Sequence, residues 1–462
     1  MLLTKPQAAD DAVCFKPATE LVEAYRRRAL SPVEVTERML ARIAAINPTI
    51  KAYYQVDEAG ARATAKAAEA RWAKGAPAGP LDGVPVSIKD HLQTKGLSQP
   101  RGSFLNPLTP SDFDAPVSAR LRESGAVILG KTTMPELSVI PVTTSVAFGA
   151  TLNPWDLSRS PGGSSGGAAA ALAAGLCTLA VGTDGGGSIR LPAAFTGLFG
   201  HKPTLGRVPY WPGQTDRTVA GPIARTAADA GLMLNVIARP DGRDWMELPP
   251  DDTDYAAAAS QSVKGMRIAY SRDFGFAQVE AGIARAVERS VAQLKAAGCI
   301  VEEIGAVGFD AFDIYMIQAA MRLATMRKTT PPEAMARFPR MVHSVLALAE
   351  RVTVADVQRL FEGRNKLGDQ LLAIFTKYDA IASPAAPIEA PPLGTFYPDG
   401  DVGSPESRNL LAFACPFNLV HMPAISAFCG TTDRGLPAGL QLAGPKFSDA
   451  KLLALGAKIS NQ

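Results

Sequence analysis

The chain has 462 residues, of which 20% are charged and 47% hydrophobic, and its net charge is +3 at pH 7. This balance is typical of a globular protein and excludes a disordered chain, while the small net charge argues against a nucleic-acid partner. No stretch has the ~18 uninterrupted apolar residues that a membrane span needs. The first fifteen residues lack an apolar signal core, so we expect a cytoplasmic protein without membrane contact.

The potential metal-binding side chains are scattered. Five cysteines and four histidines show none of the spacings of a metal site, so we expect reduced, buried thiols and histidines that are packed or on the surface. A Ser-His-Asp triad stays open as an alternative, because such triads assemble from residues far apart in sequence. The residues concerned are Cys14, Cys177, Cys299, Cys415 and Cys429, and His91, His201, His343 and His421.

The first 75 residues are predicted to be helical. Ser31 is a candidate N-cap, Pro32 suits the first turn, and Glu34 follows at the capping-box position. Apolar periodicity then predicts a helix over Val35–Ile46, and an alanine-rich helix over Glu58–Lys74.

Short strands and helices alternate in the next part of the chain. Val84–Ile88, Ala126–Leu129 and Leu176–Gly182 are predicted strands, and Val117–Gly125 is a predicted helix. This alternation predicts a layered α/β core. Residues 240–400 instead contain charged helices and methionine-rich stretches, and Phe413–Leu455 returns to strands, turns and a final helix.

Gly125–Thr132 matches the phosphate-loop pattern G-x-x-x-x-G-K-[ST]. The mechanism requires a flexible loop between a strand and a helix, but the four intervening residues are themselves strand-like, and Pro135 follows soon after. We interpret the match as accidental.

Two glycine-serine clusters are the strongest chemical signal. Ser160–Gly167 and Gly182–Arg190 are joined by a helix-like segment, Ala168–Leu176, so serine hydroxyls and backbone N–H groups can converge there. Consecutive small residues after a strand can aim N–H groups at one point, as an oxyanion hole requires, or can form a simple turn. Asp184 and Arg190 flank the second cluster, and we expect them to form an ion pair that braces it.

Lys89 is a candidate base that could activate a serine if no histidine does so. It ends the apolar strand Val84–Ile88, and a desolvated lysine can become neutral and accept a hydroxyl proton. The alternative is an ion pair with Asp90, although successive strand residues point to opposite faces. From the residues alone, both interpretations remain open.

Taken together, these motifs resemble the amidase signature family of serine amidohydrolases. The resemblance covers most of the chain, with residues 240–400 matching weakly. It rests on segments that occur in the family's order: Gly83–Asp90, Ser160–Gly167, Gly182–Pro192, Gly200–Pro203, Gly221–Thr226, Pro416–Leu419, Pro423–Ser426 and Gly435–Gly444.

The resemblance implies a Ser–cis-Ser–Lys triad. Ser188 would be the nucleophile, Ser164 the bridging serine after a cis peptide bond from Gly163, and Lys89 the base. The N–H groups of Gly185, Gly186, Gly187 and Ser188 would bind the oxyanion. The resemblance further implies that the reaction passes through an acyl-enzyme and uses no metal and no cofactor.

The resemblance also implies an α/β fold with a large mixed β-sheet flanked by helices on both faces. We predict one domain over residues 1–462, with N-terminal helices in 1–75. Residues 76–240 and 410–462 would form the catalytic core, and 241–409 a variable helical region that shapes the substrate pocket.

Substrate contacts are predicted from two segments. Met134–Pro141 resembles the family's substrate-lining loop, with Ser138 as a backbone contact, and Tyr210 and Trp211 are candidates for another wall. The chain departs from the family pattern at His91-Leu92 and at Val420–Met422, next to motifs that shape the pocket.

Our main hypothesis is an enzyme that hydrolyses amides, and related carbamates (urethanes) or esters, of small apolar or aryl compounds. It would act as a monomer or homodimer. One alternative is the amidase-like subunit of a tRNA-dependent amidotransferase, which shares the triad. Another is a catalytically inactive binding protein, which intact Lys89, Ser164 and Ser188 argue against.

Overall fold

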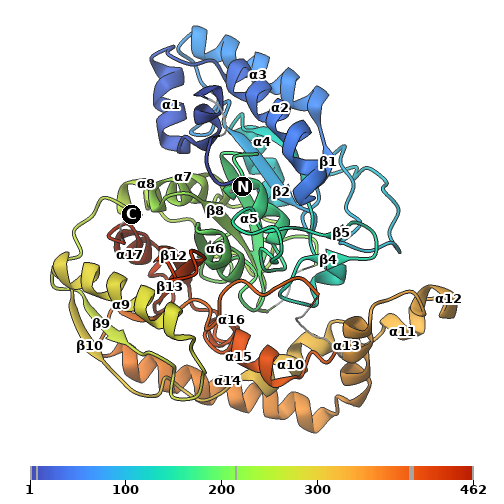
Figure 1. The fold of residues 1–462 in the computed structure, drawn as a ribbon, viewed down its shortest axis with the longest axis vertical. Helices are drawn as coiled ribbons and strands as arrows, with labels where there is room; N and C mark the ends of the chain where they lie inside the picture. Colours follow the sequence, from blue (N-terminus) through green and yellow to red (C-terminus); the bar gives the residue numbers. More distant parts are fainter. Residues whose placement is uncertain (1–2, 7–8, 214–215, 395–399, 460–462) are drawn as a thin grey trace.

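An 11-stranded sheet forms the centre of the computed structural model, which describes residues 3–6, 9–213, 216–394 and 400–459 (Figure 1). In order across the sheet, the strands are β1 (Tyr53–Val56), β3 (Val127–Thr132), β2 (Pro85–Lys89), β6 (Leu179–Asp184), β8 (Val219–Ala224), β7 (Phe199–Lys202), β12 (Ala424–Thr431), β13 (Pro437–Ala443), β11 (Ala380–Pro384), β9 (Arg267–Tyr270) and β10 (Ile300–Glu303). A separate two-stranded sheet consists of β4 (Thr144–Ser145) and β5 (Gly149–Ala150).

The large sheet is mixed. Strands β3, β2 and β6 run parallel to one another, as do β11, β9 and β10 at the other end, and the strands between these groups pair antiparallel. Parallel neighbours need crossover connections, which helices provide. The predicted mixed α/β class is therefore confirmed.

Helices make up most of the remaining chain. The α-helices are α1 (Ala18–Arg26), α2 (Pro32–Ile50), α3 (Glu58–Ala73), α4 (Pro116–Glu123), α5 (Gly166–Ala173), α6 (Arg190–Thr196), α7 (Ala227–Ile237), α8 (Tyr255–Ala258), α9 (Ala281–Ala296), α10 (Phe312–Met321), α11 (Met326–Thr329), α12 (Pro332–Met335), α13 (Arg340–Arg351), α14 (Val354–Phe375), α15 (Pro405–Leu411), α16 (Cys415–Leu419) and α17 (Asp449–Gly456), with short 3₁₀ turns at Ala9–Phe15 and Glu136–Ser138.

The two faces of the sheet are covered by different helices. Gly456 of α17 approaches Ile425 of β12 so closely that an added Cβ would collide with it. An added Cβ on Gly439 of β13 would likewise collide with Ala194 of α6 and with Ser426, which follows Ile425 in β12. Because successive strand residues point to opposite faces, α17 and α6 lie on opposite sides of the sheet.

Local sequence signals explain the helix starts. The Ser31 hydroxyl accepts a hydrogen bond from the Val33 N–H at 3.0 Å and so caps α2.

Gly130 and Lys131, the glycine and lysine of the phosphate-loop match, lie in strand β3. Lys131 is buried there and donates to the Leu92 carbonyl. The match does not form a phosphate loop, as interpreted from the sequence.

Residues 241–409 contribute strands as well as helices. Strands β9, β10 and β11 come from this segment, while α10 to α14 form the helical part at the bottom of Figure 1.

The five cysteines are buried and have free thiols. No helix within the described ranges is both long and apolar enough to cross a membrane.

Candidate active site

The ends of two neighbouring strands bring Lys89 next to the second glycine-serine cluster. Strands β2 and β6 are parallel, with Ile88 opposite Val181, so their carboxyl ends meet at the same edge of the sheet. All five residues of β2 are buried, because this strand lies between β3 and β6. Lys89, at the end of β2, is therefore fully buried and lies beside Thr183.

The side-chain nitrogen of Lys89 is surrounded by hydroxyl groups. Its Nζ lies 2.8 Å from the Oγ of Ser164, 2.9 Å from the Oγ of Ser165 and 2.8 Å from the Oγ1 of Thr183. Asp90 turns away and accepts hydrogen bonds from the backbone N–H groups of Arg101 and Gly102. Lys89 thus contacts the first glycine-serine cluster rather than its acidic neighbour.

Burial controls the protonation of Lys89. Desolvation lowers its pKa to about 7, against the opposing influence of the carboxylates of Asp184 and Asp90. Near neutral pH a large fraction of the side chain is therefore an amine with a free lone pair. Such an amine can accept the proton of a neighbouring hydroxyl group.

The first glycine-serine cluster places two serines around this amine. The peptide bond between Gly163 and Ser164 is cis, as the resemblance implies. Ser165 follows at the N-cap of α5, where its hydroxyl donates to the Thr183 carbonyl at 3.1 Å and accepts from the Thr183 N–H at 3.2 Å. Its own N–H donates to the carbonyl of Ser188 at 3.3 Å. Ser165 therefore connects both clusters with Lys89.

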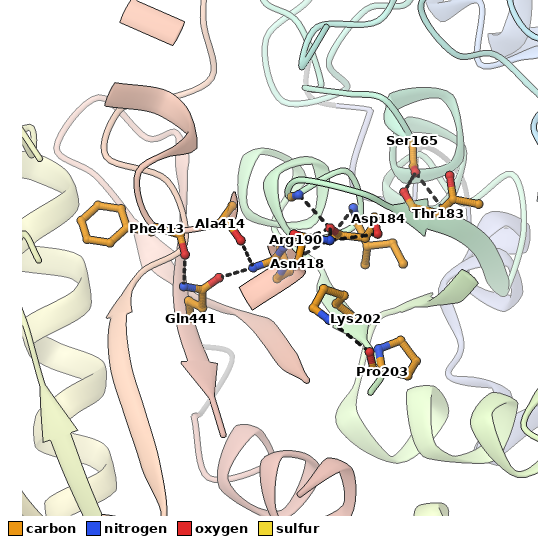
Figure 2. Close-up of polar contacts among 12 residues, drawn as sticks. Ser165, Thr183, Asp184, Arg190, Lys202, Pro203, Phe413, Ala414, Asn418 and Gln441 are labelled. Carbon is orange, nitrogen blue, oxygen red and sulfur yellow. Dashed lines mark hydrogen bonds and ion pairs between the residues drawn. The ribbon is translucent and has the colours of Figure 1, made fainter. Parts of the chain in front are cut away.

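A buried ion pair braces the second cluster (Figure 2). Asp184 Oδ2 lies 2.9 Å from the Nε of Arg190, and neither side chain has exposed surface. The guanidinium also donates to Asn418 and Gln441, and the Asn418 amide donates back to Asp184. Burial would raise the pKa of Asp184, but Arg190 outweighs it and holds that pKa well below its usual range. The predicted ion pair is confirmed.

The same carboxylate uses one of the predicted oxyanion donors. Asp184 Oδ1 accepts a hydrogen bond from the Gly187 N–H at 2.7 Å, and Oδ2 accepts from the Ile189 N–H at 3.2 Å. Gly187 has φ of 115°, a conformation that strongly favours glycine. Its N–H points to Asp184, so of the four predicted oxyanion donors those of Gly185, Gly186 and Ser188 form no hydrogen bond within the described residues.

Two adjoining cavities open where the two clusters meet, and they share Ser138, Ser188, Arg217, Tyr315 and Arg322 as lining residues. Together they make up the cavity of the candidate site, which Ser164, Ser188, Gly185 and Gly186 line. One side of the cavity is apolar, formed by Val139, Ile140, Leu191, Met316, Val345 and Leu411. Its polar side includes His91, Thr183, Arg217, Thr218, Tyr315 and Arg322.

The predicted substrate contacts fall at different distances from this cavity. Ser138 lines it. The Tyr210 hydroxyl contacts the His91 ring at 3.2 Å, so it lies one side chain behind the cavity. Trp211 packs against Phe113, with ring centroids 5.2 Å apart, and is not among the lining residues.

His91 is the histidine at the site. Its Nδ1 lies 3.4 Å from the Thr183 hydroxyl, and burial, with nearby cations, lowers its pKa well below the usual range. His201 contacts Asp449, and His421 contacts Arg364. Among the described residues, the side chain that reaches Ser164 is Lys89, which does not support a Ser-His-Asp triad.

Several residues of the site, Thr183 among them, were not predicted from the sequence. Ser165 had a usable signal, because it is the second serine of the Ser-Ser pair in the first cluster. Arg217, Tyr315 and Arg322 come from a loop and from the α10 region, where neither periodicity nor resemblance locates side chains. Only the tertiary structure brings them beside Ser188.

Comparison with known proteins identifies the family of the chain. A family model described as amidase matches residues 34–453. The chain is 35% identical, over 92% of both chains, to the A subunit of the glutamyl-tRNA(Gln) amidotransferase from Myxococcus xanthus. Its fold is similar to that of a bacterial aryl acylamidase (TM-score 0.88, 27% identity, 96% of both chains). The A subunit of the same amidotransferase from Thermotoga maritima also has a similar fold (TM-score 0.81, 27% identity, 96% of this chain and 94% of that one). The chain belongs to the amidase signature family, whose members act on C–N bonds.

Proposed function

We propose that the chain hydrolyses a small amide through an acyl-enzyme on Ser188. The observation that carries this proposal is the contact of the buried Lys89 amine with Ser164, at a cavity that Ser164 and Ser188 line together. Neutral Lys89 accepts the proton of Ser164, and Ser164 accepts that of Ser188 as it attacks the carbonyl carbon. Ser164 then gives this proton to the leaving amine as the C–N bond breaks, and it takes its own proton back from Lys89. Water hydrolyses the acyl ester through the same two groups, which releases the carboxylic acid and restores the Ser188 hydroxyl.

Backbone N–H groups supply the oxyanion site in this proposal. Those of Gly185, Gly186 and Ser188 face no described acceptor, whereas that of Gly187 is held by Asp184. Each oriented donor of this kind typically contributes a factor of roughly 10²–10³ to kcat. The ion pair of Asp184 with Arg190 fixes the loop, so these donors need little reorganisation during the reaction.

The lining of the cavity favours a substrate with an apolar part. Leu191, Met316, Val345 and Leu411 offer no hydrogen-bonding groups, which suits an aryl or alkyl group. Carbamates and esters of the same shape are further candidates, because they pass through the same tetrahedral intermediate. In this proposal the enzyme needs no metal or cofactor, because Lys89 supplies the base.

The second candidate is the glutaminase component of a tRNA-dependent amidotransferase. The relatives favour it over the first candidate, since the proteins from Myxococcus xanthus and Thermotoga maritima described above, which match the chain over nearly its whole length, are amidotransferase A subunits. Their name includes a tRNA, which runs against the expectation of no nucleic-acid partner. The described lining residues favour the first candidate, because they contain no Asp or Glu to pair with the α-ammonium group of glutamine.

Labelling with a serine-reactive probe tests the proposed nucleophile. A fluorophosphonate probe should label the wild type and the S158A variant, whose serine is exposed in the segment before the first glycine-serine cluster, but not S188A. Lack of labelling in the wild type would contradict the proposed nucleophile and favour an inactive binding protein.

A substrate screen separates the two candidates. Aryl amides, with matched carbamates and esters, are compared with free glutamine as substrates of the purified chain. Hydrolysis of the aryl compounds by the chain alone supports the first candidate. Glutaminase activity that requires co-purified partner proteins supports the second.

A further inference from the structure

Two arginines line the cavity beside Ser188, and each is held by a backbone carbonyl. Arg217 is buried and precedes β8, and its Nη1 donates to the Gly185 carbonyl at 2.9 Å. Arg322 follows α10, and its Nη2 donates to the Leu137 carbonyl at 3.0 Å. In the part of the chain that the structure describes, neither guanidinium forms an ion pair with a carboxylate, and the buried Nε of Arg322 has no hydrogen-bond partner.

The surroundings of these arginines are positively charged. Burial, with the charges of Arg217 and Arg101, lowers the pKa of Arg322 to about 10. The carboxylates of Asp216 and Glu136 pair with neither arginine: Asp216 Oδ2 accepts from Arg364 at 2.6 Å, and Glu136 Oε2 accepts from the backbone N–H of Val146 at 3.1 Å. Two cations that share a cavity without a counter-charge repel each other, and an anion bound between them would be stabilised.

We propose that the substrate carries a carboxylate group that Arg217 and Arg322 bind together. A guanidinium matches the planar geometry of a carboxylate, and hydrogen bonds between ionised groups are the stronger ones. The apolar side chains of Leu191, Met316 and Leu411 then contact the rest of the molecule. This inference rests on the proposed amide hydrolysis, and it narrows the substrate class from apolar amides to amides with an apolar part and a carboxylate.

Binding to the S188A variant tests the inference without turnover. Two matched pairs of ligands are titrated calorimetrically: succinanilic acid against butyranilide, and para-acetamidobenzoate against acetanilide. The first pair places the carboxylate on the acyl side of the amide bond, and the second places it on the amine side. We expect at least one anionic ligand to bind about 10- to 100-fold more tightly than its neutral partner.

Arginine variants locate the effect. In the S188A background, R217M and R322M should each reduce the preference for the anionic ligand by about tenfold or more. R285M is the matched control, because Arg285 is exposed on α9 and pairs with Asp433, and it should preserve the preference.

Each outcome decides one of two questions. Equal binding of the anionic and neutral ligands in both pairs overturns the inference. An equal loss of the preference for the anionic ligand in R285M and R322M overturns it as well. Hydrolysis of the neutral anilides by the wild type tests the proposed function separately. An enzyme that hydrolyses butyranilide without any carboxylate preference would therefore retain the proposed function and lose this inference.

Discussion

The carboxylate of Asp184 forms a fully buried ion pair with Arg190, with 2.9 Å between Oδ2 and Nε, and also accepts the N–H of Gly187. The two residues flank the loop that carries Ser188, so the pair fixes both ends of that loop. Asn418 and Gln441, from the C-terminal part of the chain, complete the hydrogen bonds of the guanidinium. One buried charge pair thus connects the serine loop to strand β13.

Replacing Asp184 should destabilise the fold. D184N leaves the guanidinium of Arg190 buried without a counter-charge, and breaking a buried pair in this way costs about 3–5 kcal/mol. Urea unfolding followed by circular dichroism measures the free energy of unfolding. D433N is the control, because it removes the exposed pair with Arg285 and should cost only about 0–1 kcal/mol. Equal effects of the two variants would show that the buried pair is not a main source of stability.

The pH dependence of the reaction should follow Lys89. Its pKa is lowered to about 7, and the neutral amine that accepts the proton exists above that pH. We therefore expect kcat/KM to rise roughly tenfold per pH unit below about 7 and to level off above it. Steady-state kinetics with an amide that does not titrate in this range provide the profile. A rate that falls as the pH rises through 7 would exclude Lys89 as the base.

Removing the amine should abolish activity while the fold is retained. K89M keeps an unbranched stem in the core but cannot accept a proton, so we expect kcat to fall by roughly 10²–10⁴-fold. K131M is a matched control, since Lys131 is equally buried on the adjacent strand but donates to the Leu92 carbonyl. Its substitution should lower thermal stability rather than kcat. Full activity in K89M would contradict the proposed mechanism.

Ser165 should act as a positioning residue for Lys89. S165A removes a hydroxyl that lies 2.9 Å from Nζ and stabilises the protonated lysine. We expect kcat/KM to fall about tenfold, and the pH profile to move to lower pH because the pKa of Lys89 falls further. A purely structural role would change the unfolding transition and leave the midpoint of the pH profile in place.

The sequence by itself determined the α/β class and the family, and it predicted Lys89, Ser164 and Ser188 as the catalytic residues, because glycine-serine loops and a strand-end lysine leave local patterns. It also predicted the Asp184–Arg190 pair, whose members are close in the chain. The tertiary structure alone decided that Thr183 and Ser165 surround Lys89, and that Asp184 uses the Gly187 N–H. It also placed Arg217 and Arg322 at the cavity. These contacts join segments far apart in sequence or depend on one backbone angle, so no local pattern could reveal them.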